Sequence, residues 1–186
     1  MVAHAVVSKI RRRCAHLASD RRGVSSIEFA LLLPLMLIMY FGSIEVTDAI
    51  SADRQVTLVA STVADITSEY SSVGANDISN ILAASSAVLA PFPVANATVT
   101  LTSVVFDANG NPSIDWSRTL NGTQRSGNVS SLIPAALKVA NTSIIWGEAT
   151  YAYRPTLGYV LTGTYQMYSQ IFMRPRLSTS VQCNSC

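Results

Sequence analysis

The chain has 186 residues, of which 49% are hydrophobic and only 13% are charged, well below the roughly 25% charged residues of a typical soluble domain. The net charge of +2 is divided unevenly, because six bases and one acid precede Val24 whereas seven bases and ten acids follow. This composition argues against an ordinary soluble domain and against a nucleic-acid-binding surface. One membrane span joined to one modest domain accounts for it.

Residues 1–23 form a basic leader, which we expect to be irregular or helical on the cytoplasmic side of a membrane. A Lys/Arg cluster beside a span stays in the cytoplasm, and no Lys or Arg occurs between Arg22 and Arg54. We therefore predict that the N-terminus is cytoplasmic and that the chain beyond the span lies outside. The arginines that form this topology signal are Arg11, Arg12, Arg13, Arg21 and Arg22.

Residues 24–47 are the predicted transmembrane helix. The strictly uncharged run, Phe29–Ile44, would span about 24 Å at 1.5 Å per residue, slightly less than the roughly 30 Å hydrocarbon core, whereas Val24–Val46 is long enough. A cleaved secretory signal peptide is the alternative. Its apolar region would be shorter and would end in a small-residue cleavage site, whereas bulky residues continue here through Phe41. We predict a single-pass anchor.

One acid, Glu28, interrupts the apolar segment almost at its start, in the sequence RRGVSSIEF. A carboxylate at that depth is costly in lipid and is by default a functional hypothesis. In a plain anchor, this side chain would reach from the interface toward water. The position of Glu28 five residues after Gly23 favours a different interpretation, in which the segment is a processing and assembly signal.

The segment RRGVSSIEFALLLPLMLIMYFGSIEV, residues 21–46, resembles the TadE-like family of the tight-adherence (Tad/Flp) pilus systems. Basic residues, a glycine, a Glu-aromatic pair and an apolar run carry the resemblance in combination. Phe29 stands where major Flp pilins usually have Tyr, which points toward the minor-pilin branch. YAYRP at 151–155 and MRPR at 173–176 are similar to segments of larger relatives, including TadG-like proteins.

The resemblance implies that a prepilin peptidase cuts between Gly23 and Val24. Glycine would give the peptidase close access to the backbone, and cleavage would leave Val24 with a positively charged α-amine. Glu28 lies four residues further along and shares a helix face with Val24. Its carboxylate would compensate that amine, or the amine of a neighbouring subunit, and would fix the axial register between helices. Glu28 and Phe29 are therefore the predicted assembly residues.

Residues 48–73 are predicted to continue the helix beyond the membrane as an amphipathic extension. Apolar residues recur there at alternating spacings of three and four over about three heptads, the pattern of a single buried stripe. The stripe comprises Ala49, Ala52, Val56, Val59, Val63, Ile66 and Tyr70. It would pack either on the chain's own globular part or as a seam against neighbouring subunits.

Residues 74–186 are the predicted outer domain, placed in the periplasm by the topology argument. A second helix is expected over 77–89, before Pro91 and Pro93. Period-two patterns rich in β-branched and aromatic residues predict strands at 96–107, 113–120, 142–153 and 165–173. Asn109-Gly110 is a strong hairpin signal between the first two. The fold class is thus α+β and pilin-like, with a long N-terminal helix and a small antiparallel sheet.

Residue types needed for catalysis are scarce beyond the leader. Both histidines, His4 and His16, lie within the leader, and no nucleotide-binding, metalloprotease or serine-hydrolase motif occurs. We expect no enzymatic activity, no cofactor and no metal site. Asp107 and Asp115 lie on the predicted hairpin and are interpreted as solvated turn positions.

Other polar and aromatic residues have structural interpretations. Glu45 is expected to be solvated near the outer interface, with an ion pair to a partner's base, such as Arg54, as the alternative. The aromatic residues of the outer domain are expected in the core and in strand pairs, although they would also suit a carbohydrate or surface-contact patch. They are Trp116, Trp146, Tyr151, Tyr153, Tyr159, Tyr165 and Tyr168.

The cysteines divide between the two sides of the membrane. Cys14 lies in the leader, where the cytosol keeps thiols reduced, whereas Cys183 and Cys186 lie in the tail, in a predicted oxidising compartment. A tail disulfide between Cys183 and Cys186 and free or intermolecular thiols are both compatible with the sequence. A zinc site needs about four ligands, which this tail does not supply.

The predicted function is structural: a minor pilin or pseudopilin in the assembly of a Tad-type adhesion pilus, anchored in the bacterial inner membrane. The expected partners are other pilin subunits, a prepilin peptidase, the inner-membrane pilus assembly platform and membrane lipid, with no nucleic acid and no small-molecule substrate. Two alternatives stay open. The protein could be an uncleaved, membrane-anchored assembly factor, or a membrane-tethered module that binds a surface ligand.

Overall fold

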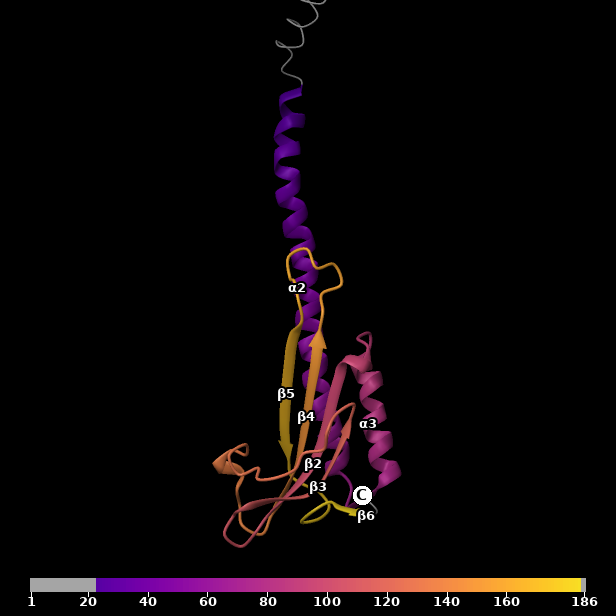
Figure 1. Ribbon diagram of the computed structural model, residues 1–186, viewed down its shortest axis with the longest axis vertical. Helices are drawn as coiled ribbons and strands as arrows, with labels where there is room; N and C mark the ends of the chain where they lie inside the picture. The colour runs from indigo at the N-terminus through magenta and orange to yellow at the C-terminus, as the bar shows by residue number, and fades with distance from the viewer. Residues whose placement is uncertain (1–22, 185–186) are drawn as a thin grey trace, which may run out of the picture. The chain divides into compact units, whose positions relative to one another are not determined.

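The computed structural model describes residues 23–184, and these divide after Ile44 into two compact units (Figure 1). A long helix precedes a small antiparallel sheet, which confirms the predicted α+β, pilin-like fold class. The elements are α2 (Val24–Ser68), β1 (Ser72–Gly74), α3 (Ala75–Leu89), η2 (Val94–Asn96), β2 (Ala97–Phe106), β3 (Pro112–Leu120), η3 (Ala135–Leu137), β4 (Ser143–Tyr153), β5 (Tyr165–Met173) and β6 (Gln182–Asn184).

Helix α2 is 45 residues long and continues through Pro34. Its apolar N-terminal part is long enough and hydrophobic enough to cross a membrane, which fits single-pass anchoring. The helix ends at Ser68, five residues before the predicted end of the amphipathic extension. It ends there because the chain turns at Glu69 and Tyr70 and residues 72–74 then pair as a strand.

The larger sheet has the strand order β3-β2-β4-β5, with every neighbouring pair antiparallel. Each of its strands begins and ends within one residue of the range that the sequence predicts. The predicted hairpin joins β2 to β3, and Gly110 adopts a φ of 79° there, which glycine tolerates best. A β-bulge between Ser103 and Val104 shifts the register of β2 against β3.

The main core lies between the sheet and the C-terminal part of α2. Val56, Val59 and Val63 are each at most 2% exposed and belong to one cluster with Leu101 and Ile145. The predicted stripe packs on the chain's own sheet through its buried residues, for which the alternative of a seam against neighbouring subunits is wrong, whereas Tyr70, beyond the end of α2, is 41% exposed. The compact unit that holds the sheet accordingly includes the C-terminal part of α2 from Glu45 onward.

The opposite face of the sheet carries a smaller cluster, formed with the segment between β3 and β4. Val129 and Ile133 from this segment pack with Val104, Ile144 and Trp146. The C-terminal segment adds a parallel pair, β1 with β6, which the sequence analysis missed. Val181, just before β6, is fully buried, and its carbonyl oxygen accepts a hydrogen bond from the Trp116 indole at 2.8 Å.

Candidate functional site

The N-terminal half of α2 has an apolar surface on all sides. Its large side chains are between 39% and 75% exposed from Ile27 to Tyr40. A contiguous apolar surface of this kind marks a membrane or protein interaction site. The exposed residues are Ile27, Phe29, Leu31, Leu32, Leu33, Leu35, Met36, Leu37, Ile38, Met39 and Tyr40.

The predicted processing and assembly residues lie at the start of this helix. Gly23 is exposed and directly precedes the first residue of α2, Val24. Glu28 and Phe29 are also exposed on α2, and the four-residue spacing places Val24 and Glu28 on one helix face. The arginines of the topology signal and Cys186 lie outside the described residues. The roles of all these residues therefore stay predictions.

Glu45 differs from its prediction. The side chain is only 2% exposed, and its carboxylate accepts hydrogen bonds from three successive backbone N–H groups of the loop between β4 and β5. The donors are Tyr159 at 2.7 Å, Val160 at 3.0 Å and Leu161 at 2.6 Å. The expectation of a solvated residue is wrong, because the three successive N–H groups form a concave anion site around the carboxylate. The alternative of a pair with a partner's base, such as Arg54, stays a prediction.

A second polar cluster, on the face of the sheet opposite to α2, could not be predicted from the sequence. Arg125 donates to both carboxylate oxygens of Glu148, from Nε at 2.8 Å and from a terminal nitrogen at 2.5 Å. The guanidinium also lies 4.2 Å from the ring centre of Trp146. Glu148 is 5% exposed and also accepts a hydrogen bond from the Tyr168 hydroxyl at 2.9 Å. Although the ring of Tyr168 is half exposed, partial desolvation of its hydroxyl beside Glu148, together with this hydrogen bond, raises the pKa of Tyr168 to about 12.

Asp107 is the solvated turn residue that was predicted, whereas Asp115 is solvated but lies within strand β3 rather than in the turn. Asp107 is exposed, and its carboxylate accepts hydrogen bonds from the Asn111 side chain and from the backbone N–H groups of Asn111 and Asn109. The Asn111 side chain, followed by the Asn111 backbone, lowers the pKa of Asp107. Asp115 is exposed on β3. The two residues thus act as surface and turn positions.

The aromatic residues separate into two groups. Trp116, Trp146, Tyr151 and Tyr153 are buried, which confirms the core interpretation for them. The other tyrosines are exposed: two of them occupy strand-pair positions on β5, as predicted, opposite Tyr153 and Thr150 of β4, whereas the one in the loop before β5 is neither in the core nor in a strand pair. The three are Tyr159, Tyr165 and Tyr168.

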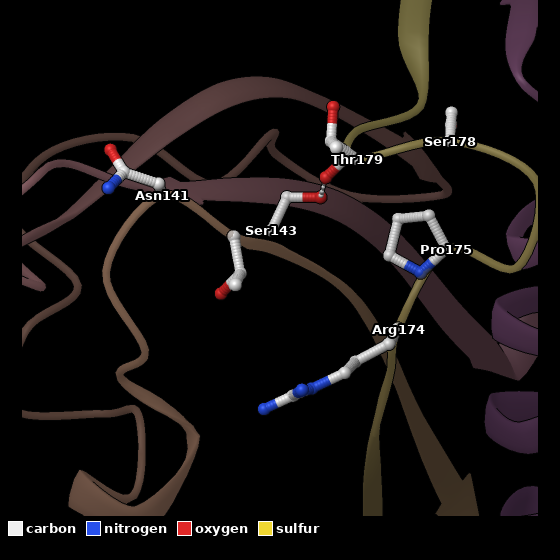
Figure 2. Close-up of a pocket in the computed structure, with 7 residues that line it drawn as sticks. Asn141, Ser143, Arg174, Pro175, Ser178 and Thr179 are labelled. Atoms are coloured by element: carbon white, nitrogen blue, oxygen red, sulfur yellow. Dashed lines mark hydrogen bonds between the residues drawn. The ribbon is translucent and has the colours of Figure 1, made fainter.

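The tail cysteine and one small cavity complete the candidate features. Cys183 is disulfide-bonded, and its pairing with Cys186 stays a prediction. A cavity of about 150 Å³ is lined by residues that include Asn141, Ser143 and Arg174. Figure 2 shows that the Ser143 hydroxyl donates to the Thr179 carbonyl oxygen, at 2.7 Å. Among the described residues, no group of three or more His, Cys, Asp or Glu side chains could hold a metal ion.

A long helix with an exposed apolar half and a small α+β domain define the class of membrane-anchored, pilin-like proteins. Residues 23–65 match the family model for TadE-like protein, which confirms the predicted resemblance over this segment. The match suggests involvement in Tad pilus systems. Searches of curated proteins and of solved structures each found no match. The similarity to TadG-like proteins near the C-terminus therefore stays a prediction.

Proposed function

We propose that this protein is a structural minor pilin or pseudopilin that takes part in the assembly of a Tad-type adhesion pilus. The observation that carries the proposal is that the TadE-like match begins at Gly23, the residue before the predicted cut. The same match covers the apolar half of α2 and Glu28. These features support a helix that is first held in lipid and then packs against the helices of other subunits.

Cleavage after Gly23 would create a charged group that takes part in subunit assembly. The new α-amine of Val24 would lie one helical turn from the carboxylate of Glu28. In a low-dielectric surrounding, an unpaired carboxylate is costly, whereas a paired one specifies position along the helix axis. Glu28 would thus align this subunit with a neighbour, and the exposed apolar side chains would supply the contact area.

The proposed role is structural rather than catalytic. The partners would be other pilin subunits, a prepilin peptidase, the inner-membrane assembly platform and the lipid around the span. The N-terminus would be cytoplasmic and the domain after the span would be periplasmic, because the arginines of the leader precede the span. The chain could then enter an extracellular pilus.

The first test is the intact mass and N-terminal sequence of the membrane-extracted protein, with and without the prepilin peptidase. We expect an N-terminus at Val24 only when the peptidase is present. The Gly23→Ala variant is a useful companion, because an added β-carbon at Gly23 meets no atom within 4 Å. A defect in its processing would therefore reflect the peptidase rather than the fold. A leader retained in both strains would favour the uncleaved assembly factor.

The second test is the Glu28→Gln variant, scored by its recovery in sheared pili. We expect the variant to be processed and inserted but excluded from pili. Glu69→Gln is the matched control, because Glu69 is exposed and its ion pair with Arg176 lies at the surface, where such pairs contribute little. Equal recovery of both variants would show that Glu28 is an interfacial acid without an assembly role.

A further inference from the structure

The loop between β4 and β5, residues 154–164, exposes three large apolar side chains among its polar ones. Leu157 is 42% exposed, Tyr159 is 74% exposed and Val160 is 45% exposed. Arg154 is the only charged residue of the loop, and the sequence then stays uncharged up to Arg174. Adjacent exposed apolar residues on a loop mark an interaction surface, whereas single ones are ordinary.

Two sets of hydrogen bonds fix this loop. The Glu45 carboxylate accepts from the N–H groups of Tyr159, Val160 and Leu161, so their backbone is turned toward the helix. At the base of the loop, Arg154 Nε donates to the Thr164 hydroxyl at 2.9 Å. The exposed side chains of Tyr159 and Val160 are therefore presented by an anchored backbone.

Glu45, which holds this loop, lies at the end of the apolar segment of α2. Glu45 directly follows the uncharged run Phe29–Ile44 and belongs to the same continuous helix. The loop is thus attached at the residue where the apolar run ends. Tyrosine is enriched at membrane interfaces because its ring is apolar and its hydroxyl is polar. An arginine beside such residues suits the phosphate groups of lipids.

We propose that loop 154–164 lies in the interfacial layer of the bilayer that holds the predicted span. Leu157, Tyr159 and Val160 contact the boundary between headgroups and acyl chains, and Arg154 binds headgroup phosphate. The loop gives the chain a lipid contact in addition to the span, and Glu45 holds the loop in place for it. This inference rests on the proposed membrane anchoring but not on cleavage after Gly23 or on entry into a pilus.

The test uses the full chain in lipid nanodiscs with and without brominated acyl chains, which quench nearby tryptophan fluorescence. Leu157→Trp and Val160→Trp are the probes, because both side chains are exposed and a tryptophan at either position can extend into solvent or lipid. The native Trp116 and Trp146 are at most 7% exposed. Their signal is a constant background, which the unsubstituted chain measures.

Two control positions bracket the probes. Tyr40→Trp lies in the exposed apolar half of α2 and should be quenched if the span is in lipid. Leu177→Trp is the matched negative control, since Leu177 is 72% exposed and its neighbour Arg176 donates its backbone N–H to the carbonyl of Ser68. Ser68 lies 23 residues beyond Glu45 on the same helix, which is about 35 Å at 1.5 Å per residue.

We expect at least a twofold loss of probe fluorescence in brominated discs for Tyr40→Trp, Leu157→Trp and Val160→Trp, and none for Leu177→Trp. Quenching of Tyr40→Trp alone would overturn the inference while leaving the anchor intact. A blue shift of the loop probes that grows with the number of chains per disc, without quenching, would instead show a protein contact and would also overturn it. An unquenched Tyr40→Trp would overturn both the span and the loop contact, whereas the N-terminal mass reports processing independently.

Discussion

Helix α2 approaches the sheet closely at Gly147, in the central strand β4. A β-carbon at this position would lie 2.5 Å from the carbonyl oxygen of Ala60 and 2.9 Å from the β-carbon of Ala64. Optimal separations between carbon atoms are about 3.5–4.0 Å. The Gly147→Ala variant therefore requires α2 or β4 to move, because a backbone atom cannot rotate away as a side chain can.

The size of the effect follows from two opposing contributions. Overpacking a well-packed core costs about 1–3 kcal/mol, and the shortest contact here involves backbone, which favours the upper end. Replacing glycine by alanine also restricts the unfolded chain, which stabilises the fold by about 0.4–1 kcal/mol. We expect a net destabilisation of about 2 kcal/mol. For a domain of this size, that corresponds to a decrease in Tm of about 4–8 °C.

The assay is thermal unfolding of the full chain in detergent micelles, followed by tryptophan fluorescence. Both tryptophans are buried, and Trp146 is adjacent to the substituted residue. Gly23→Ala is the matched control, because it makes the same chemical change where no atom lies within 4 Å. A Tm for Gly147→Ala within 1 °C of the control would refute the argument that the helix backbone seats directly on Gly147.

Three further predictions concern the polar groups of the sheet domain. Arg125→Ala should lower the free energy of unfolding, measured in urea, by about 2 kcal/mol, because it leaves the buried Glu148 carboxylate without its cation. Arg176→Ala, which removes a surface ion pair, should lower it by less than about 1 kcal/mol. Equal losses of unfolding free energy in the two variants would contradict this prediction. The pKa of Tyr168 is raised to about 12 from about 10 in the unfolded chain, so its contribution is complete below pH 10 and is lost between pH 10 and 12. The stability difference between the wild type and Tyr168→Phe should accordingly be constant below pH 10 and shrink above it, and a difference that is constant up to pH 12 would exclude the shift. Glu45→Gln leaves one amide oxygen for three N–H donors, so limited proteolysis should cut the β4–β5 loop faster than in the wild type, and an unchanged rate would show that the carboxylate does not hold the loop.

The sequence predicts well those parts of the fold that are determined by residues close together in the chain. The strands of the larger sheet are rich in β-branched and aromatic residues, and Gly110 supplies the positive φ in the loop that joins β2 to β3. Helix α2 was predicted from its apolar run and its stripe, and the TadE-like segment from a motif within 26 residues. Each of these signals lies within one element or one turn, so no knowledge of tertiary packing was required.

The features that were missed all join residues far apart in the sequence. Glu45 meets its N–H donors across more than 110 residues, and Arg125 meets Glu148 across 23. An isolated glutamate beside a membrane span has no local partner, so its burial depends on where the β4–β5 loop folds. Gly158, with a φ of 68°, is a local sign of the turn that aims these N–H groups at the carboxylate.

The two halves of α2 show why one helix can serve two environments. Up to Tyr40 large apolar side chains occur on all sides and are exposed, a pattern that suits lipid or a bundle of helices. From Ala52 onward the buried residues form one stripe, which the chain's own sheet covers. Glu45 stands between the two patterns, and its charge is held by backbone N–H groups rather than by another subunit. Since the stripe is already used within the chain, the proposed contacts to neighbouring subunits would fall mainly to the segment that begins at Val24, where Glu28 would be the acid that sets their register.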